Sequence, residues 1–210
     1  MQNKILVTFG DSWPQGSELH ANEKPYGQLV AKKLGCNVFK NYAHPASSIS
    51  HLIVQLKNFL HMLDNTSQDA KDTVAIFFIT GPSRNMVCDK DGLWMFQTPN
   101  GGFSGPTQDK YLANITNIQY WKYIYSEKLL DITNNTTIIA LQKICNIHKI
   151  RDYYITGWEP VNFWHEIDQT KIYKHTCKDI VQSNLSVGGH PNQRGHELIA
   201  DTLTDWISDG

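Results

Sequence analysis

The sequence predicts a single α/β domain in which a mostly parallel sheet lies between two layers of helices. Short apolar runs typical of buried strands alternate with longer segments whose apolar residues recur at helical spacing. Parallel strands need helical crossovers, so this alternation favours a three-layer α/β/α sandwich. We expect one domain over residues 1–210, with a loop and helical insertion at about 85–150.

The first half of the chain contains three strand patterns and two helix patterns. Residues 4–10, KILVTFG, are apolar enough for a buried strand, and residues 26–35, YGQLVAKKLG, have the pattern of an amphipathic helix. A second strand is predicted at 37–43, NVFKNYA. Residues 47–63 repeat apolar side chains near helical spacing, and 73–81, TVAIFFITG, follow as a third strand.

The second half begins with a segment of different composition. From about 85 to 110 the chain is rich in Gly, Pro, Asn and aromatic residues, and a long loop on a sheet edge is expected there. Residues 111–150 then have helical patterns. A fourth strand is predicted at 151–158, RDYYITGW, and a closing helix at 192–207 with Asn192 as its N-cap.

Composition and charge argue against several classes of partner. Nineteen basic residues against twenty acidic ones leave a formal charge of -1, and no block of Lys or Arg suggests nucleic-acid binding. The longest aliphatic and aromatic run, Val74–Ile79, is far shorter than the roughly 20 residues of a membrane span. The first residues lack a signal-peptide pattern, so we expect a cytoplasmic or virion-associated protein.

The cysteines do not form a recognisable metal or disulfide pattern. They lie far apart and include no CxxC pair, which favours scattered reduced thiols over a zinc site. The four positions are Cys36, Cys88, Cys145 and Cys177.

Polar residues follow each of the first three predicted strands. Ser12 follows the first strand, residues 41–48 (NYAHPASS) follow the second, and residues 80–85 (TGPSRN) follow the third. Because the strands are parallel, these loops are expected to meet at one edge of the sheet, where the active cleft of such folds lies. His190 directly precedes the last helix. A serine and a histidine at one cleft are the pair that nucleophilic acyl transfer requires.

The tripeptide Gly10, Asp11, Ser12 can also be read without chemistry, since Gly and Asp are common in turns and Ser caps helices. Together with His190 it nevertheless resembles the first and last motifs of the SGNH hydrolases, also called the GDSL esterase family, over about residues 5–207. This resemblance implies a flavodoxin-like fold and ester hydrolysis without a cofactor. It also implies that Ser12 is the nucleophile and that its own amide contributes to the oxyanion hole.

The middle motifs of the family are altered in this chain. Asn41 matches the second motif, but Ala46 stands where the family usually has Gly; its N–H can still serve the oxyanion hole, although Ala adopts fewer conformations. In the third motif Ser83 stands where the family usually has Asn, so we expect the Ser83 hydroxyl to be the third oxyanion donor. Arg84 and Asn85 are alternative donors. Asp11, Asn41 and Arg84 are expected to support the site.

The last motif keeps its histidine and loses its acid. His190 matches, but Val187 stands three positions earlier, where the family usually has Asp. That Asp would fix the tautomer of the imidazole and stabilise its charged form. A backbone carbonyl, Ser186, Asp179 or Glu18 could replace it, and the sequence does not choose among them.

Other candidates favour structural roles. His196 is expected to pack or cap within the last helix, and residues 164–168, WHEID, to form a solvated turn. His44, His51 and His61 lack the i, i+4 spacing of a helical zinc pair, so no metal site is expected. The aromatic residues near the cleft could stack on sugar rings, line an acyl pocket or belong to the core. They are Trp13, Trp94, Phe96 and Phe103.

The sequence thus predicts a serine esterase that needs no cofactor and acts on a small-molecule or glycan ester, such as an acetyl or other short acyl group on a carbohydrate. Two alternatives remain. One is an acyl hydrolase acting on lipids or thioesters. The other is a catalytically silent protein of the same fold that binds carbohydrate or belongs to a virion.

Overall fold

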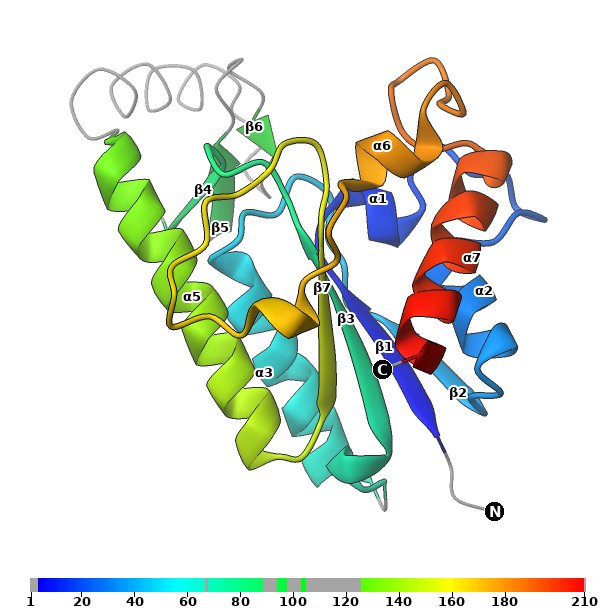
Figure 1. Ribbon diagram of the computed structural model, residues 1–210, viewed down its shortest axis with the longest axis horizontal. Helices are drawn as coiled ribbons and strands as arrows, with labels where there is room; N and C mark the ends of the chain where they lie inside the picture. The colour runs from blue at the N-terminus through cyan, green and yellow to red at the C-terminus, as the bar shows by residue number, and fades with distance from the viewer. Residues whose placement is uncertain (1–3, 67, 89–93, 98–102, 105–125, 210) are drawn as a thin grey trace.

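A four-stranded parallel sheet forms the centre of the computed structural model, which describes residues 4–66, 68–88, 94–97, 103–104 and 126–209 (Figure 1). The strand order is β2-β1-β3-β7, and every neighbouring pair is parallel. The strands are β1 (Ile5–Phe9), β2 (Val38–Asn41), β3 (Thr73–Ile79) and β7 (Arg151–Thr156). All four predicted strands are therefore confirmed. Their near-continuous apolar sequences fit a sheet that is covered on both faces.

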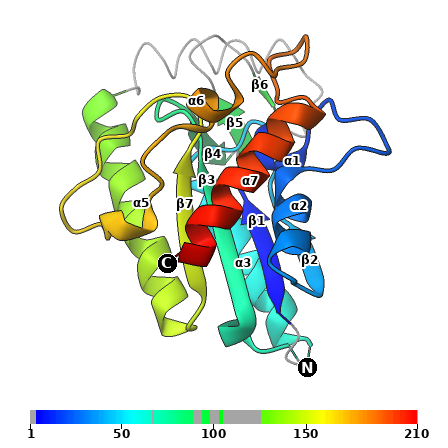
Figure 2. The ribbon, with the colours of Figure 1, turned by 45° about the vertical axis from the view of Figure 1, so that its right-hand side comes forward.

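Helices cover both faces of this sheet (Figures 1 and 2). On one face lie α3 (His51–Asp64) and α5 (Glu127–Ile147), and on the other α1 (Ser12–Gln15), α2 (Tyr26–Lys33), α6 (Cys177–Val181) and α7 (Gln193–Asp209). The predicted three-layer α/β/α sandwich is confirmed. Two short 3₁₀ turns are also present: η1 (Ala70–Asp72) precedes β3, and η3 (Gln169–Lys171) follows β7. Within the described ranges no helix combines the length and apolar character needed to cross a bilayer.

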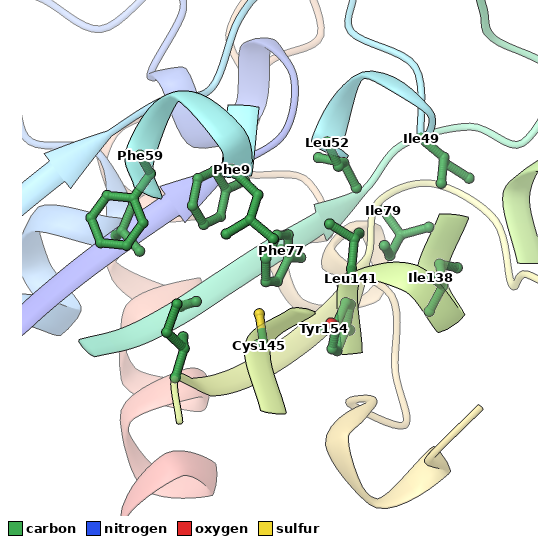
Figure 3. Close-up of a cluster of buried hydrophobic side chains, with 14 of the residues drawn as sticks. Phe9, Ile49, Leu52, Phe59, Phe77, Ile79, Ile138, Leu141, Cys145 and Tyr154 are labelled. Atoms are coloured by element: carbon green, nitrogen blue, oxygen red, sulfur yellow. The ribbon is translucent and has the colours of Figure 1, made fainter. Parts of the chain in front are cut away.

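The core between the sheet and α3 and α5 is built on a row of stacked rings (Figure 3). Phe9, Phe77 and Tyr154 are neighbours in the register of three adjacent strands. Ring centroids lie 4.6 Å apart for Phe9 and Phe77 and 5.0 Å apart for Phe77 and Tyr154, with nearly parallel planes. Burying such rings contributes about 2 kcal/mol or more each to folding, so this row fixes the three strands to one another.

The opposite core contains one aromatic residue that the sequence left unassigned. Trp13 is fully buried, and its ring lies 5.8 Å from that of Phe78 and 4.3 Å from that of Trp158. Trp13 therefore belongs to the core beneath α1 and is not part of a cleft surface. It anchors the turn that carries Ser12.

The segment after β3 differs from the predicted long loop. Strands β4 (Asn85–Cys88), β5 (Trp94–Gln97) and β6 (Phe103–Ser104) form a separate three-stranded antiparallel sheet. The aromatic residues favour strands, and the Gly and Pro residues that suggested a loop lie between them. The side chains of Trp94, Phe96 and Phe103 lie outside the described residues.

Part of the expected insertion at 85–150 is a layer of the domain itself. Helix α5 packs against α3 and β7 and contributes Ile138, Leu141 and Cys145 to the core. The helix predicted from residue 111 is described from Glu127 onward, and residues 105–125 lie outside the described residues.

Two expectations for the last helix are confirmed. Asn192 caps α7, because its Oδ1 accepts a hydrogen bond of 3.0 Å from the N–H of Gly195. His196 is fully buried, and its Nδ1 accepts a hydrogen bond of 3.1 Å from the N–H of Tyr26, at the start of α2. Burial, with a smaller effect from the positive charge of His190, lowers the pKa of His196 to about 4.

This buried histidine should make the protein sensitive to mild acid. Between pH 6.5 and 4 the unfolded chain binds a proton at His196 that the folded chain does not, so the free energy of unfolding falls as pH decreases. The loss should reach on the order of 3 kcal/mol near pH 4, and His51, whose pKa is also lowered to about 4, should add a similar effect. His196→Asn keeps an acceptor near the N–H of Tyr26 without titrating. Urea unfolding at pH 7, 5.5 and 4.5 should show a weaker pH dependence in this variant than in the wild type.

The control is His165→Asn, because the His165 side chain is 93% exposed. That variant should keep the full pH dependence, and an equal reduction in both variants would contradict the assignment to His196.

Candidate active site

The first loop of the site is a tight turn from β1 into α1. Gly10 has a φ of 143°, and a Cβ there would lie 2.7 Å from side-chain atoms of both Phe78 and Pro14, so only glycine fits. Ser12 is the first residue of α1 and is 8% exposed. The chain therefore leaves the strand through Gly-Asp-Ser in a way that puts Ser12 at the carboxyl edge of the sheet with little freedom to move.

Asp11 holds this turn against the loop that follows β3. Its carboxylate is fully buried and accepts three hydrogen bonds. Oδ1 accepts from the N–H of Trp13 at 3.0 Å, and Oδ2 accepts from the Thr80 hydroxyl at 2.7 Å and from Arg84 Nη1 at 2.6 Å. The supporting roles expected for Asp11 and Arg84 thus correspond to one buried ion pair. Because Nη1 of Arg84 is bound to Asp11, that nitrogen is not free to stabilise an oxyanion.

The second loop is fixed to the first by Asn41. Its Nδ2 donates a hydrogen bond of 2.8 Å to the carbonyl of Pro14, and its Oδ1 accepts from the Thr8 hydroxyl and the N–H of Ala43, both at 3.1 Å. Further along, Ala46 has a φ of 60°, in the left-handed region that favours glycine. The conformation expected of a glycine is therefore present, although the residue is alanine.

A residue that the sequence did not single out completes this connection. Gln55 lies on the buried side of α3, where its Oε1 accepts from the N–H of Gly10 and its Nε2 donates to the carbonyl of Gly10, each at 2.8 Å. Nε2 also approaches Ser47 Oγ at 3.0 Å. The sequence feature that could have indicated this role is a single amide side chain, Gln55, among the apolar residues of that helix face, Leu52, Leu56 and Phe59.

The third loop places Ser83 beside a cavity of about 340 Å³. The side-chain Nδ2 of Asn134 donates a hydrogen bond of 2.9 Å to the carbonyl of Pro82 and so holds this loop against α5. In the described part of the chain no hydrogen bond engages the Ser83 hydroxyl, which leaves it available to a ligand.

The last loop pairs His190 with Glu18. The Nδ1 of His190 lies 2.8 Å from Glu18 Oε2, and the Ser186 hydroxyl donates to the same oxygen. The other candidate acid, Asp179, instead accepts from the hydroxyl and N–H of Thr176 in the capping box of α6. Val187, at the family's acid position, is fully exposed.

The structure therefore connects the first three loops directly and brings a carboxylate to the histidine of the last one. Ser12, Asp11, Asn41 and Ser83 all lie at the carboxyl edge of the parallel strands. Among the described residues no hydrogen bond joins the Ser12 hydroxyl to His190. Catalytic hydrogen bonds are often long in the absence of a substrate, so this arrangement is compatible with a Ser-His pair.

Of the remaining histidine candidates, His44 and His51 are neighbours, with ring centroids 6.1 Å apart. His51 is largely buried, and its Nδ1 lies 2.9 Å from Ser47 Oγ. Burial, with a smaller effect from the positive charge of His44, lowers the pKa of His51 to about 4. The His61 carbonyl accepts from the Asn65 side chain. Considering only the described residues, no three His, Cys, Asp or Glu side chains are grouped to hold a metal ion.

Two further expectations concern a turn and the thiols. The predicted turn at 164–168 is confirmed, with His165 exposed and Asp168 capping the following 3₁₀ turn. Cys36, Cys145 and Cys177 are free thiols, and the side chain of Cys88 lies outside the described residues.

Comparison with solved structures identifies the fold. A psychrotrophic esterase, EstA, from Pseudoalteromonas sp. superposes with a TM-score of 0.55 at 13% identity, covering 98% of this chain and 97% of that one. An acetyl xylan esterase, Est2A, from Butyrivibrio proteoclasticus gives 0.57 at 12% identity, covering all of this chain and 64% of that one. The chain has the SGNH hydrolase fold.

A third solved structure is that of a carbohydrate esterase whose active site is described as having divergent catalytic and non-catalytic binding functions. It gives a TM-score of 0.50 at 11% identity and covers all of this chain and 66% of that one. No protein-family model matches the sequence, and no curated protein matches it.

The Gln55 contact predicts that the site and the fold share one support. Gln55→Leu fills similar space but leaves the N–H of Gly10 buried without a partner, while the Gly10 carbonyl keeps the hydrogen bond of 3.0 Å from the N–H of His44. The free energy of unfolding should therefore fall by about 1–3 kcal/mol. Urea unfolding measures this change. Gln28→Leu, on the exposed side of α2, is the matched control and should change stability by less than about 0.5 kcal/mol. Equal stability of the two variants would contradict the structural role of Gln55.

Proposed function

We propose that the protein is a serine hydrolase that cleaves carboxylic esters, with Ser12 as the nucleophile and His190 as the base. The observation that carries the proposal is the capped turn after β1. It holds Ser12 at the carboxyl edge of the sheet and continues to Glu18, whose carboxylate lies 2.8 Å from the Nδ1 of His190. The likeness of the fold to solved esterases supports the same chemistry.

The reaction proceeds in two halves. In the first, Nε2 of His190 takes the hydroxyl proton as Ser12 Oγ attacks the carbonyl carbon, and the resulting imidazolium returns that proton to the departing alcohol. This leaves an acyl group on Ser12. In the second half His190 takes a proton from water, the water oxygen bonds to the acyl carbon, and the acid leaves as the proton returns to Ser12 Oγ.

Negative charge on the carbonyl oxygen is stabilised by three donors. The amides of Ser12 and Ala46 and the hydroxyl of Ser83 form the proposed oxyanion hole. The left-handed backbone of Ala46 and the unengaged hydroxyl of Ser83 support these assignments. Such donors are effective because they are already oriented when the charge develops.

For the substrate we propose a short acyl group, such as acetyl, on a carbohydrate. The cavity beside Ser83 is at the small end of the range for ligand pockets. Leu130 and Val161 give it an aliphatic wall, and the carboxylates of Asp131 and Glu159 are acceptors for hydroxyl groups. A sugar ring offers both an apolar face and a set of hydroxyl donors, which suits this lining.

Two alternatives are distinguished by one set of assays. Hydrolysis of p-nitrophenyl esters of increasing chain length, measured beside acetate release from acetylated polysaccharides, should show a preference for acetyl groups and for the polysaccharide. A rate that increases with chain length would favour a lipid or thioester hydrolase. Binding of the polysaccharide without hydrolysis of any ester would favour a catalytically silent carbohydrate-binding protein.

Ser12 and His190 should behave as one catalytic unit. Ser12→Ala and His190→Ala should each reduce esterase activity to near background, and the double variant should lose little more, because both residues serve one step. A fluorophosphonate probe should label Ser12 in the wild type. Additive losses in the double variant, or labelling of a different serine, would reject the assignment.

Ser83→Ala tests the oxyanion hole. Loss of a donor used mainly in the transition state should lower kcat by roughly ten- to a thousandfold with little change in KM. Steady-state kinetics on p-nitrophenyl acetate measure both constants. An unchanged kcat would show that the third donor lies elsewhere.

A further inference from the structure

The last loop has no acid at the position where the family motif places one. Val187 occupies it, and its side chain is fully exposed. The surrounding turn is closed by two backbone hydrogen bonds, from the N–H of Ser186 to the carbonyl of His190 at 2.7 Å and from the N–H of Gly189 to the carbonyl of Ser186 at 3.0 Å. A side chain at position 187 therefore projects into solvent.

A carboxylate reaches His190 from a distant part of the chain instead. Glu18 Oε2 lies 2.8 Å from the Nδ1 of His190, 172 positions away in the sequence, and also accepts from the Ser186 hydroxyl. The hydrogen bond from Ser186 lowers the pKa of Glu18 most, and the hydrogen bond from His190 lowers it further. The carboxyl group of Glu18 is therefore ionised at neutral pH. An ionised carboxylate only accepts, so the proton of a neutral imidazole must lie on Nδ1.

The backbone conformation at Glu18 and the absence of a side chain at Gly188 both allow this contact. Glu18 has a φ of 68°, a left-handed conformation that is uncommon for glutamate. On the other side, a Cβ at Gly188 would collide with the Glu18 carboxylate, so only glycine allows the approach. The turn that carries Glu18 starts at the nucleophile, since the N–H of Ser17 donates to the carbonyl of Ser12 at 3.0 Å.

We propose that Glu18 is the acidic positioning residue of the catalytic site, taking the place of the family's Asp from the segment that also carries Ser12. Its carboxylate keeps the proton of His190 on Nδ1, which leaves the lone pair of Nε2 to accept the proton of Ser12. It also stabilises the imidazolium formed in each half of the reaction. This inference rests on the proposed esterase function, and the experiments below separate the two.

The first experiment removes the charge and keeps the shape. Glu18→Gln should lower kcat on p-nitrophenyl acetate by about 10²–10⁴-fold, with KM changed by less than about threefold. The acidic limb of the kcat/KM profile should move to lower pH, because the imidazolium loses its anionic partner. A contact that only ties two loops together would not produce this shift.

Glu23→Gln is the matched control. Like Glu18, Glu23 lies in the loop between α1 and α2, and the variant removes its carboxylate. That carboxylate accepts a hydrogen bond of 2.7 Å from the N–H of His20 and has no part in the His190 contact. Its kcat and pH profile should match those of the wild type. If Glu18→Gln also matched the wild type, the proposal would be wrong.

A second variant tests position 187, where the family motif has Asp and this chain has Val. Val187→Asp should change kcat by less than about twofold, because Glu18 already serves His190 and position 187 faces solvent. An increase of tenfold or more would show that His190 lacks an acid in the wild type, and would overturn the proposal.

A measurement that needs no activity separates this proposal from the esterase function. The ¹⁵N shifts of the His190 ring should show the proton on Nδ1 in the wild type at neutral pH and a mixture of tautomers in Glu18→Gln. A locked tautomer in a wild type inert towards every ester would remove the esterase proposal and keep the role of Glu18. If the wild type hydrolyses esters but the His190 tautomer is unchanged in Glu18→Gln, the esterase proposal would stand and the proposed role of Glu18 would be wrong.

Discussion

The buried carboxylate of Asp11 is the constraint on which the site depends. A fully buried carboxylate is strongly destabilising unless it is paired and hydrogen-bonded, and this one has three donors. Those donors come from two places in the chain: the turn after β1, and the segment after β3 that holds Thr80 and Arg84. The two loops must therefore meet before Asp11 is stabilised. The same buried contacts therefore stabilise the sheet edge and hold the turn that carries Ser12.

The acid–base pair is organised on a different principle. His190 and Glu18 have side chains that are 24% and 37% exposed, whereas Asp11 has no exposed surface. The family's Asp and His share one loop, so their geometry is local. Here the acid follows α1 and the histidine precedes α7, so their geometry depends on how closely those two loops approach. Gly188 makes that approach possible, since any side chain there would displace the carboxylate.

The sequence was sufficient for features that depend on local pattern and insufficient for those that depend on distant contacts. The strands, α2 and the Asn192 cap follow from apolar runs and capping preferences, and the structure has them. The sheet of β4, β5 and β6 was predicted as a loop because Gly and Pro outweighed the aromatic residues. Glu18 was one of several candidate acids, since spacing along the chain says nothing about a contact across 172 positions.

The exposure of the acid–base pair also connects substrate binding with catalysis. In water an ion pair at this distance contributes little, because the solvent screens both charges. Buried Asp11 is insulated from this effect, but His190 and Glu18 are not. A substrate that covers the cleft excludes water from the imidazole, lowers the local dielectric constant and strengthens the attraction between the carboxylate and the developing imidazolium. The site is therefore expected to stabilise the charged form of His190 most when an ester is bound, which is when Ser12 must lose its proton.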